Sequence, residues 1–101
     1  MDVRLRYFDG CPSWKTTYTW LREVLDELGL SGVEPVLERV ETPEEAQRLH
    51  FVGSPTVLID GRDPFAGSLT MYGLACRVYQ VPGGLAGSPT REQLRQALAA
   101  A

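Results

Sequence analysis

Two cysteines, Cys11 and Cys76, are the residues of this chain best suited to chemistry. Cys11 follows an apolar segment that ends in Asp9-Gly10, and Pro12 comes directly after it, where the pattern predicts that a helix begins. Unpaired N–H groups and the positive end of a helix dipole stabilise a thiolate at such a position. We therefore expect the pKa of Cys11 to lie below the free value of about 8.5 and Cys11 to act as a nucleophile. The alternative is a small, buried, unreactive thiol.

The position three residues after Cys11, where a redox motif places its second thiol, holds Trp14. Tryptophan cannot resolve a mixed disulfide, so a two-cysteine cycle within residues 11–14 is excluded. The remaining chemistry is that of a monothiol, in which Cys11 attacks a disulfide and an external thiol releases it. Trp14 also begins the apolar stripe of its helix, which favours packing over stacking on a substrate.

The elements that must position Cys11 follow from periodicity and turn signals. Alternating or β-branched segments predict strands over 3–7, 33–40, 54–60 and 74–81. Apolar spacings of three and four, with capping residues, predict helices over about 12–29, 42–49 and 88–100. Pro35 makes the second strand an edge strand. The first two strands are expected to be parallel and the last two antiparallel.

The segment between the last two predicted strands, residues 61–73, is longer than a hairpin needs. It is therefore either functional or packed down by Phe65, Met71 and Tyr72. The charges at its start, Asp60, Arg62 and Asp63, are interpreted as turn and surface residues.

The order of elements, with "CPSW" (11–14) and "GSPTVLIDG" (53–61), resembles the thioredoxin-like superfamily. "CPSW" is similar to a glutaredoxin-type Cys-Pro-x-Cys whose second cysteine is replaced. The resemblance implies one thioredoxin-like α/β domain over 1–101, of order β-α-β-α-β-β-α, with a four-stranded mixed sheet flanked by helices on both faces. It also implies that Pro55 is cis and faces Cys11, and that the backbone of Ser54 binds a thiol or peptide. We assign substrate binding to Pro12, Ser13, Trp14, Ser54, Pro55 and Thr56.

Cys76 is the other candidate for a resolving thiol. In the inferred topology it lies near the start of the strand antiparallel to 56–60, toward the end of the sheet remote from Cys11. A disulfide needs Cα atoms within about 7 Å, so we expect a structural Cys76 and no pairing, unless the 61–73 loop changes the geometry. The two separated cysteines also resemble those of organomercurial lyases, although no aspartate occupies position 14. Because thiolates bind soft metals, a soft-metal or organomercurial site that uses Cys11 and Cys76 is one alternative function.

Other polar residues offer less. His50, the one histidine, could serve as a base for Cys11, but a helix-end position favours a surface role. The glycine-rich segment 81–89 corresponds to a loop that holds glutathione carboxylates in glutaredoxins, or is a flexible connector. No CxxC or HxxxH spacing occurs, so we predict no metal site.

Composition limits the partners. The net charge of −3 and the dispersed cations argue against nucleic acid. No apolar segment of about 18 residues and no signal-peptide pattern occurs, which predicts a cytoplasmic protein without a membrane partner. Nine arginines against one lysine suggest a bacterial, high-GC genome.

We therefore predict a monothiol thiol-disulfide oxidoreductase with Cys11 as its nucleophile, and the first alternative is a non-catalytic thioredoxin-like binding module. The partners would be a small thiol or disulfide, or a protein disulfide. No cofactor is expected beyond a low-molecular-weight thiol as co-substrate, and the protein is expected to be a monomer.

Overall fold

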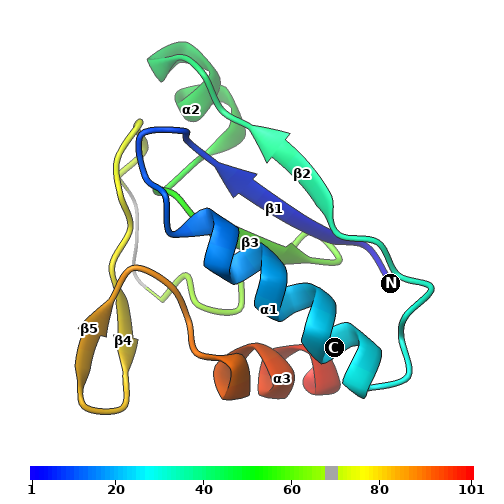
Figure 1. Ribbon diagram of the computed structural model, residues 1–101. Helices are drawn as coiled ribbons and strands as arrows, with labels where there is room; N and C mark the ends of the chain where they lie inside the picture. Colours follow the sequence, from blue (N-terminus) through cyan, green and yellow to red (C-terminus); the bar gives the residue numbers. More distant parts are fainter. Residues whose placement is uncertain (68–70) are drawn as a thin grey trace.

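The structure is a computed structural model that describes residues 1–67 and 71–101. Its elements, in chain order, are β1 (Val3–Tyr7), α1 (Trp14–Glu27), β2 (Val36–Arg39), α2 (Pro43–Leu49), β3 (Thr56–Ile59), β4 (Tyr79–Val81), β5 (Gly84–Ala86) and α3 (Arg91–Ala100) (Figure 1). Within these described ranges, no helix is both long enough and apolar enough to cross a membrane.

The main sheet has three strands, with β1 in the centre. β1 pairs in parallel with β2 and antiparallel with β3, so Leu5 lies between Leu37 and Val57. Val3 and Leu5 are buried, whereas Arg4 and Arg6 between them are half-buried, as the alternation in the sequence predicts. The edge position that Pro35 predicts for β2 is confirmed.

The predicted four-stranded sheet is wrong. β4 pairs with β5 in a separate two-stranded sheet, and the antiparallel partner of β3 is β1. Gly83 and Gly84, at φ of +90° and +149°, turn the chain back directly after β4. The glycine-rich segment 81–89, for which a flexible connector was one interpretation, therefore contains β5, the strand that pairs with β4. Of the predicted strand 74–81, only its last three residues form β4.

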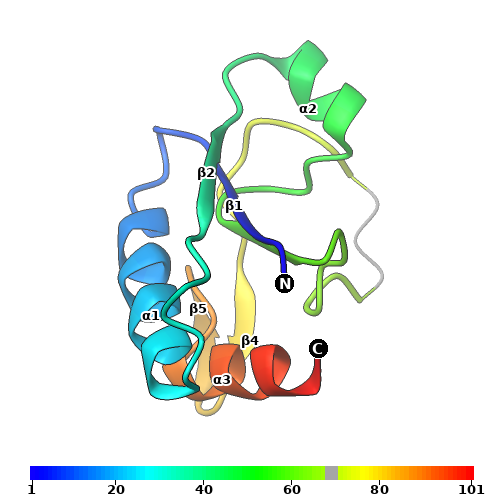
Figure 2. The same cartoon turned by 90° about the vertical axis from the view of Figure 1, so that its right-hand side faces the viewer.

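The larger hydrophobic core lies between the sheet and two helices. α1 and α3 pack side by side over it (Figures 1 and 2) and contribute buried leucines, among them Leu21, Leu25, Leu94 and Leu98. α2 lies beyond the C-terminal ends of β1 and β2 (Figure 1) and has a smaller cluster of its own around Phe51. The loop between β1 and α1, which carries Cys11, therefore lies between the two clusters.

Side-chain caps mark the start of two of the three helices. α1 begins at Trp14, two residues later than predicted, after a turn in which Lys15 N–H donates to the Pro12 carbonyl, and its N-cap Ser13 makes no side-chain hydrogen bond. Thr42 and Thr90 cap α2 and α3, each accepting a hydrogen bond from a backbone N–H three residues later. Cys11 precedes α1 by three residues, whereas the predicted helix over about 12–29 would follow it directly.

Candidate functional site

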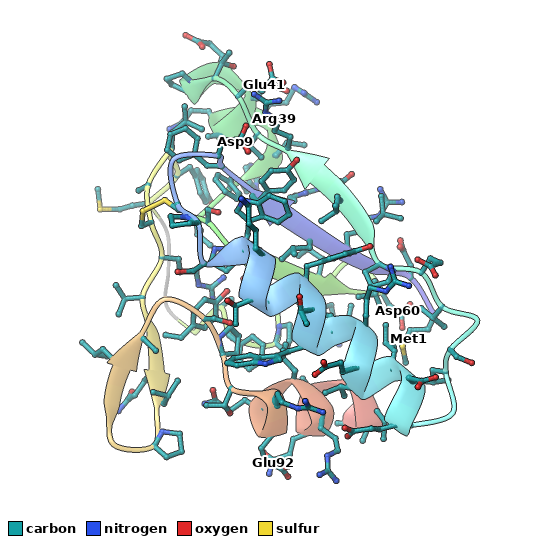
Figure 3. The ribbon with its side chains drawn as sticks, viewed as in Figure 1. Met1, Asp9, Arg39, Glu41, Asp60 and Glu92 are labelled. Carbon is teal, nitrogen blue, oxygen red and sulfur yellow. A yellow bond between two sulfur atoms is a disulfide. The ribbon has the colours of Figure 1, made fainter. Side chains whose placement is uncertain are left out.

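Cys11 and Cys76 form a disulfide bond, with an S–S distance of 2.09 Å and a Cα–Cα distance of 5.5 Å. In Figure 3 the yellow bond joins the loop ahead of α1 to the segment that leads to β4. The expectation that Cys76 lies at the far end of the sheet is therefore wrong.

The pairing has a topological cause. Gly73 N–H donates to the carbonyl of Phe51, so the chain at Gly73 lies beside the residues that precede β3. Cys76 then pairs with Ser54 in parallel orientation instead of beginning an antiparallel strand beside 56–60. Cys76 therefore lies at the N-terminal end of β3, next to Cys11.

The two cysteines differ in exposure. Cys11 is only 2% exposed, and its N–H donates to the carbonyl of Phe8 at 3.0 Å, which closes the turn over Asp9-Gly10. Cys76 is exposed, and so are its neighbours Ala75 and Val78. The disulfide therefore joins a buried sulfur-bearing residue to one at the surface.

Ser54 connects both cysteine-bearing segments. Its N–H donates to the carbonyl of Ala75 at 2.8 Å, and its carbonyl accepts from Arg77 N–H at 2.9 Å, so both backbone groups bind the residues that flank Cys76. Its hydroxyl oxygen accepts from Phe8 N–H at 2.9 Å, on the segment that holds Cys11. The Ser54–Pro55 bond is cis, as the resemblance implied.

Behind Cys76, the buried side chain of Arg77 fixes the segment to β3 and its following loop. Its guanidinium forms an ion pair with Asp63 at 2.6 Å and donates to the carbonyl of Phe65 at 2.7 Å and to the Thr56 hydroxyl at 3.3 Å. It also lies over the Tyr79 ring, 4.4 Å from its centroid. We call the Arg77 side chain, with its contacts to Asp63, Phe65 and Thr56, the Arg77 anchor.

Two neighbours support the Arg77 anchor. The Tyr79 hydroxyl donates to the carbonyl of Pro55, and burial raises the pKa of Tyr79 well above its usual value. Gly53 has φ of +126°, and a Cβ there would come within 2.9 Å of the Arg77 Cβ and 3.3 Å of the Ala75 carbonyl oxygen. A glycine is therefore required for the segment to approach.

The predicted substrate residues fall into two groups. Pro12 is exposed, Ser13 is half-buried, and Trp14 is half-buried with its ring stacked on Tyr7 at 4.1 Å. Pro55 is buried, and the polar groups of Ser54 and Thr56 are engaged within the chain. The Thr56 hydroxyl donates to the Gly53 carbonyl at 2.6 Å. Substrate docking by these residues stays a prediction, and in this state Ser54 and Thr56 hold the protein's own segment.

His50, considered as a base for Cys11, is the C-cap of α2, and its ring stacks on Tyr72 at 4.8 Å. The Asp9 carboxylate, in the turn before Cys11, pairs with Arg39 at 2.9 Å. Neither contact involves a cysteine. The polar residues around the disulfide come from β3 and the segment before β4 instead.

The long loop is packed only in part. Phe65 lies edge-on to Tyr79, with ring centroids 5.6 Å apart, as the packed-down alternative requires, whereas Met71 is 87% exposed and does not pack. Residues 68–70 of this loop lie outside the described ranges. The interpretation of Asp63 as a surface charge is wrong, because its side chain is 11% exposed and paired.

The segment 81–89 reaches the start of α1. A Cβ on Gly87 would come within 2.5 Å of the Ser13 hydroxyl oxygen, and the Ser88 and Thr17 hydroxyls are hydrogen-bonded at 2.6 Å. This contact packs the residues that follow β5 against the helix that follows Cys11.

Sequence reasoning missed Arg77, Asp63 and Gly53 as parts of the site. The signal that could have found Arg77 was a single cation in the segment 74–81, whose other residues carry no charge, since a buried cation needs a partner.

Comparisons with known proteins add no identity: neither the family models, nor the curated proteins, nor the solved structures contain a match to this chain. Among the described residues, no group of three or more histidine, cysteine, aspartate or glutamate side chains is placed to hold a metal ion. The chemistry that the site offers is that of two adjacent sulfurs, which can exchange with external thiols or, when reduced, bind one soft ion together.

Proposed function

We propose that the protein is a thiol-disulfide oxidoreductase whose redox pair is Cys11 and Cys76. One observation carries this proposal: the only two cysteines of the chain, 65 residues apart, are bonded to each other. With Cys76 in reach, the cycle needs no external resolving thiol, unlike the monothiol cycle that the sequence predicts. The likeness of "CPSW" to a glutaredoxin motif, and through it to the thioredoxin-like superfamily, supports the same chemistry.

The structure around the pair favours reversible closure. The hydrogen bonds that Ser54 accepts from Phe8 and Arg77 and donates to Ala75 hold both cysteine-bearing segments without the help of the disulfide. Reduction would therefore leave the two thiols close together, where either can resolve a mixed disulfide formed on the other. The proposed compartment is the cytoplasm, in which such a disulfide is transient and cycling.

The test is a redox titration together with a turnover assay. The protein is equilibrated with mixtures of reduced and oxidised glutathione and quenched in acid, and its free thiols are alkylated and counted by mass. Reduction of a small disulfide by glutathione is then followed with wild type, Cys11→Ser, Cys76→Ser and the double variant. We expect a reversible two-electron transition, no turnover in the double variant, and lowered turnover in each single variant, because glutathione alone must then resolve the mixed disulfide.

Two results would count against the proposal. Full turnover in Cys76→Ser would restore the monothiol cycle. A disulfide that resists both glutathione and dithiothreitol in the folded protein would make it a structural cross-link and favour the non-catalytic binding module. Circular dichroism of each variant shows whether lost turnover reflects lost folding.

Capture of a soft metal ion is the second candidate, and the adjacency of the sulfurs favours it. Once reduced, Cys11 and Cys76 would present two thiolates whose Cα atoms are 5.5 Å apart, and thiolates are the ligands that soft ions prefer. Titration of the reduced protein with Hg²⁺, followed by thiolate-to-metal charge-transfer absorbance, should saturate at one ion per chain. A single Cys→Ser variant that binds with unchanged affinity would exclude a two-thiolate site.

A further inference from the structure

We propose that Cys76 is the sulfur that an external thiol attacks, and that Cys11 leaves as the thiolate. This inference rests on the proposed function and inverts the roles that the sequence suggests. Its basis is the exposure contrast, because the residue of Cys11 is 2% exposed whereas that of Cys76 is exposed. Exchange requires the nucleophile to reach the sulfur that it attacks.

Reduction of the Cys11–Cys76 disulfide consumes two small thiols. The thiolate of a small thiol, RS⁻, attacks Cys76 Sγ, the S–S bond breaks, and its electron pair leaves on Cys11 Sγ, giving R–S–S–Cys76 and the Cys11 thiolate. A second RS⁻ attacks the sulfur of the R group, releasing RSSR and the Cys76 thiolate. The protein disulfide is thereby reduced by two electrons and two RSH are oxidised to RSSR. The two thiolates take up protons from water.

Reoxidation follows the reverse path. The Cys76 thiolate attacks a small disulfide RSSR and expels RS⁻, and the Cys11 thiolate then attacks Cys76 Sγ and expels the second RS⁻. Cys11 is the resolving cysteine in this direction. Its segment is held in place by the hydrogen bond from its N–H to the Phe8 carbonyl, so the thiolate stays where Cys76 returns to it.

The same geometry selects low-molecular-weight thiols over extended peptides. A peptide substrate would need free backbone groups beside the disulfide in order to pair as an added strand. At Ser54 both groups are taken, by Ala75 and Arg77. The protein's own segment occupies that strand position, and the Arg77 anchor keeps it there.

The test identifies which cysteine carries the incoming thiol. Oxidised wild-type protein is mixed with reduced glutathione, quenched in acid at a series of short times, alkylated with N-ethylmaleimide and digested with trypsin. Trypsin separates the cysteines into peptides 7–15 and 63–77. We expect peptide 63–77 to carry glutathione and peptide 7–15 to carry N-ethylmaleimide. Extrapolated to zero time, the amount of this species should be at least ten times that of the species with the two labels exchanged.

Each other outcome has a separate meaning. Glutathione on 7–15 at the earliest times overturns this inference and leaves the oxidoreductase proposal intact. An unreacted disulfide at every glutathione concentration overturns the oxidoreductase proposal itself, and this inference with it. A second measurement uses the folded Cys11→Ser variant and oxidised glutathione. The rate at which this variant forms a mixed disulfide should equal the rate at which reduced wild type loses its first thiol. A tenfold slower reaction would assign the first attack to Cys11.

Discussion

Arg77 and Asp63 form an ion pair that is nearly closed to solvent, with Nη1 and Oδ2 2.6 Å apart and side-chain exposures of 2% and 11%. The backbone N–H of Arg77 also donates to the Ser54 carbonyl. Arg77, the residue after Cys76, is therefore held by both its side chain and its main chain. The position of the exposed cysteine is therefore set by a buried charge.

Removing that charge should be costly. We expect Arg77→Met to lower the free energy of unfolding by about 3 kcal/mol, because it leaves the Asp63 carboxylate buried without its partner. Urea unfolding of the oxidised protein measures the change. The matched control is Arg91→Met, which breaks exposed pairs with Glu23 and Glu27 and should cost less than about 1 kcal/mol. Equal costs for the two variants would contradict a buried anchor.

The close approach at Gly53 gives a second prediction. Gly53→Ala adds a Cβ within 2.9 Å of the Arg77 Cβ at a φ of +126°, so it should destabilise the protein by about 1–3 kcal/mol and move the Cys76 segment away from Ser54. The control is Gly61→Ala, at a φ of +82° with no atom within 4 Å of the added Cβ. The excess cost of Gly53→Ala over Gly61→Ala, measured by urea unfolding, reports the clash together with the greater backbone strain of alanine at φ of +126°. No excess would mean that the approach is not tight.

The disulfide should stabilise the chain, because it closes a loop between residues 65 positions apart. In the chain-entropy account, a loop of that size is worth about 4 kcal/mol through the unfolded state. Oxidised wild type should therefore unfold at a clearly higher urea concentration than reduced wild type, and the double variant Cys11→Ser, Cys76→Ser should unfold close to the reduced protein. Coincident oxidised and reduced transitions would refute this.

The elements that follow local patterns could be predicted from the sequence. α1 differs from its predicted range by two residues at each end, and α2 ends at Leu49 as expected. In both helices the capping residues and the apolar spacing lie within the element itself, so its neighbours do not need to be known.

The strand partner of segment 74–81 could not be predicted from the sequence. Its alternation of apolar and polar residues is the same whether it joins the main sheet or forms a short hairpin. Its partners were decided by Ser54 and by the Gly83-Gly84 turn. The tetrapeptide Gly-Ser-Pro-Thr makes the same point, since it occurs at 53–56, where it leads into β3, and at 87–90, where it caps α3. The disulfide and the Arg77–Asp63 pair likewise depend on the backbone contacts of residues 73–77 with residues 51–54, which no local pattern encodes.

Tyr79 should make the stability of the protein fall in alkali. Burial raises the pKa of Tyr79 in the folded state, with a smaller contribution of the same sign from Asp63 that Arg77 opposes. Since the folded pKa lies above the unfolded value of about 10, the stabilisation is fully present below pH 10 and is lost as the pH rises beyond it.

The variant Tyr79→Phe tests this dependence. It should lose about 1 kcal/mol at pH 7, because the hydrogen bond to the Pro55 carbonyl is removed, but its unfolding free energy should decline less steeply than that of wild type between pH 9 and about pH 11. Unfolding in urea at each pH measures both effects. Tyr18→Phe, which keeps Tyr79, should retain the steep decline. If Tyr79→Phe and wild type declined in parallel, the buried phenol would not be the group that destabilises the fold in alkali.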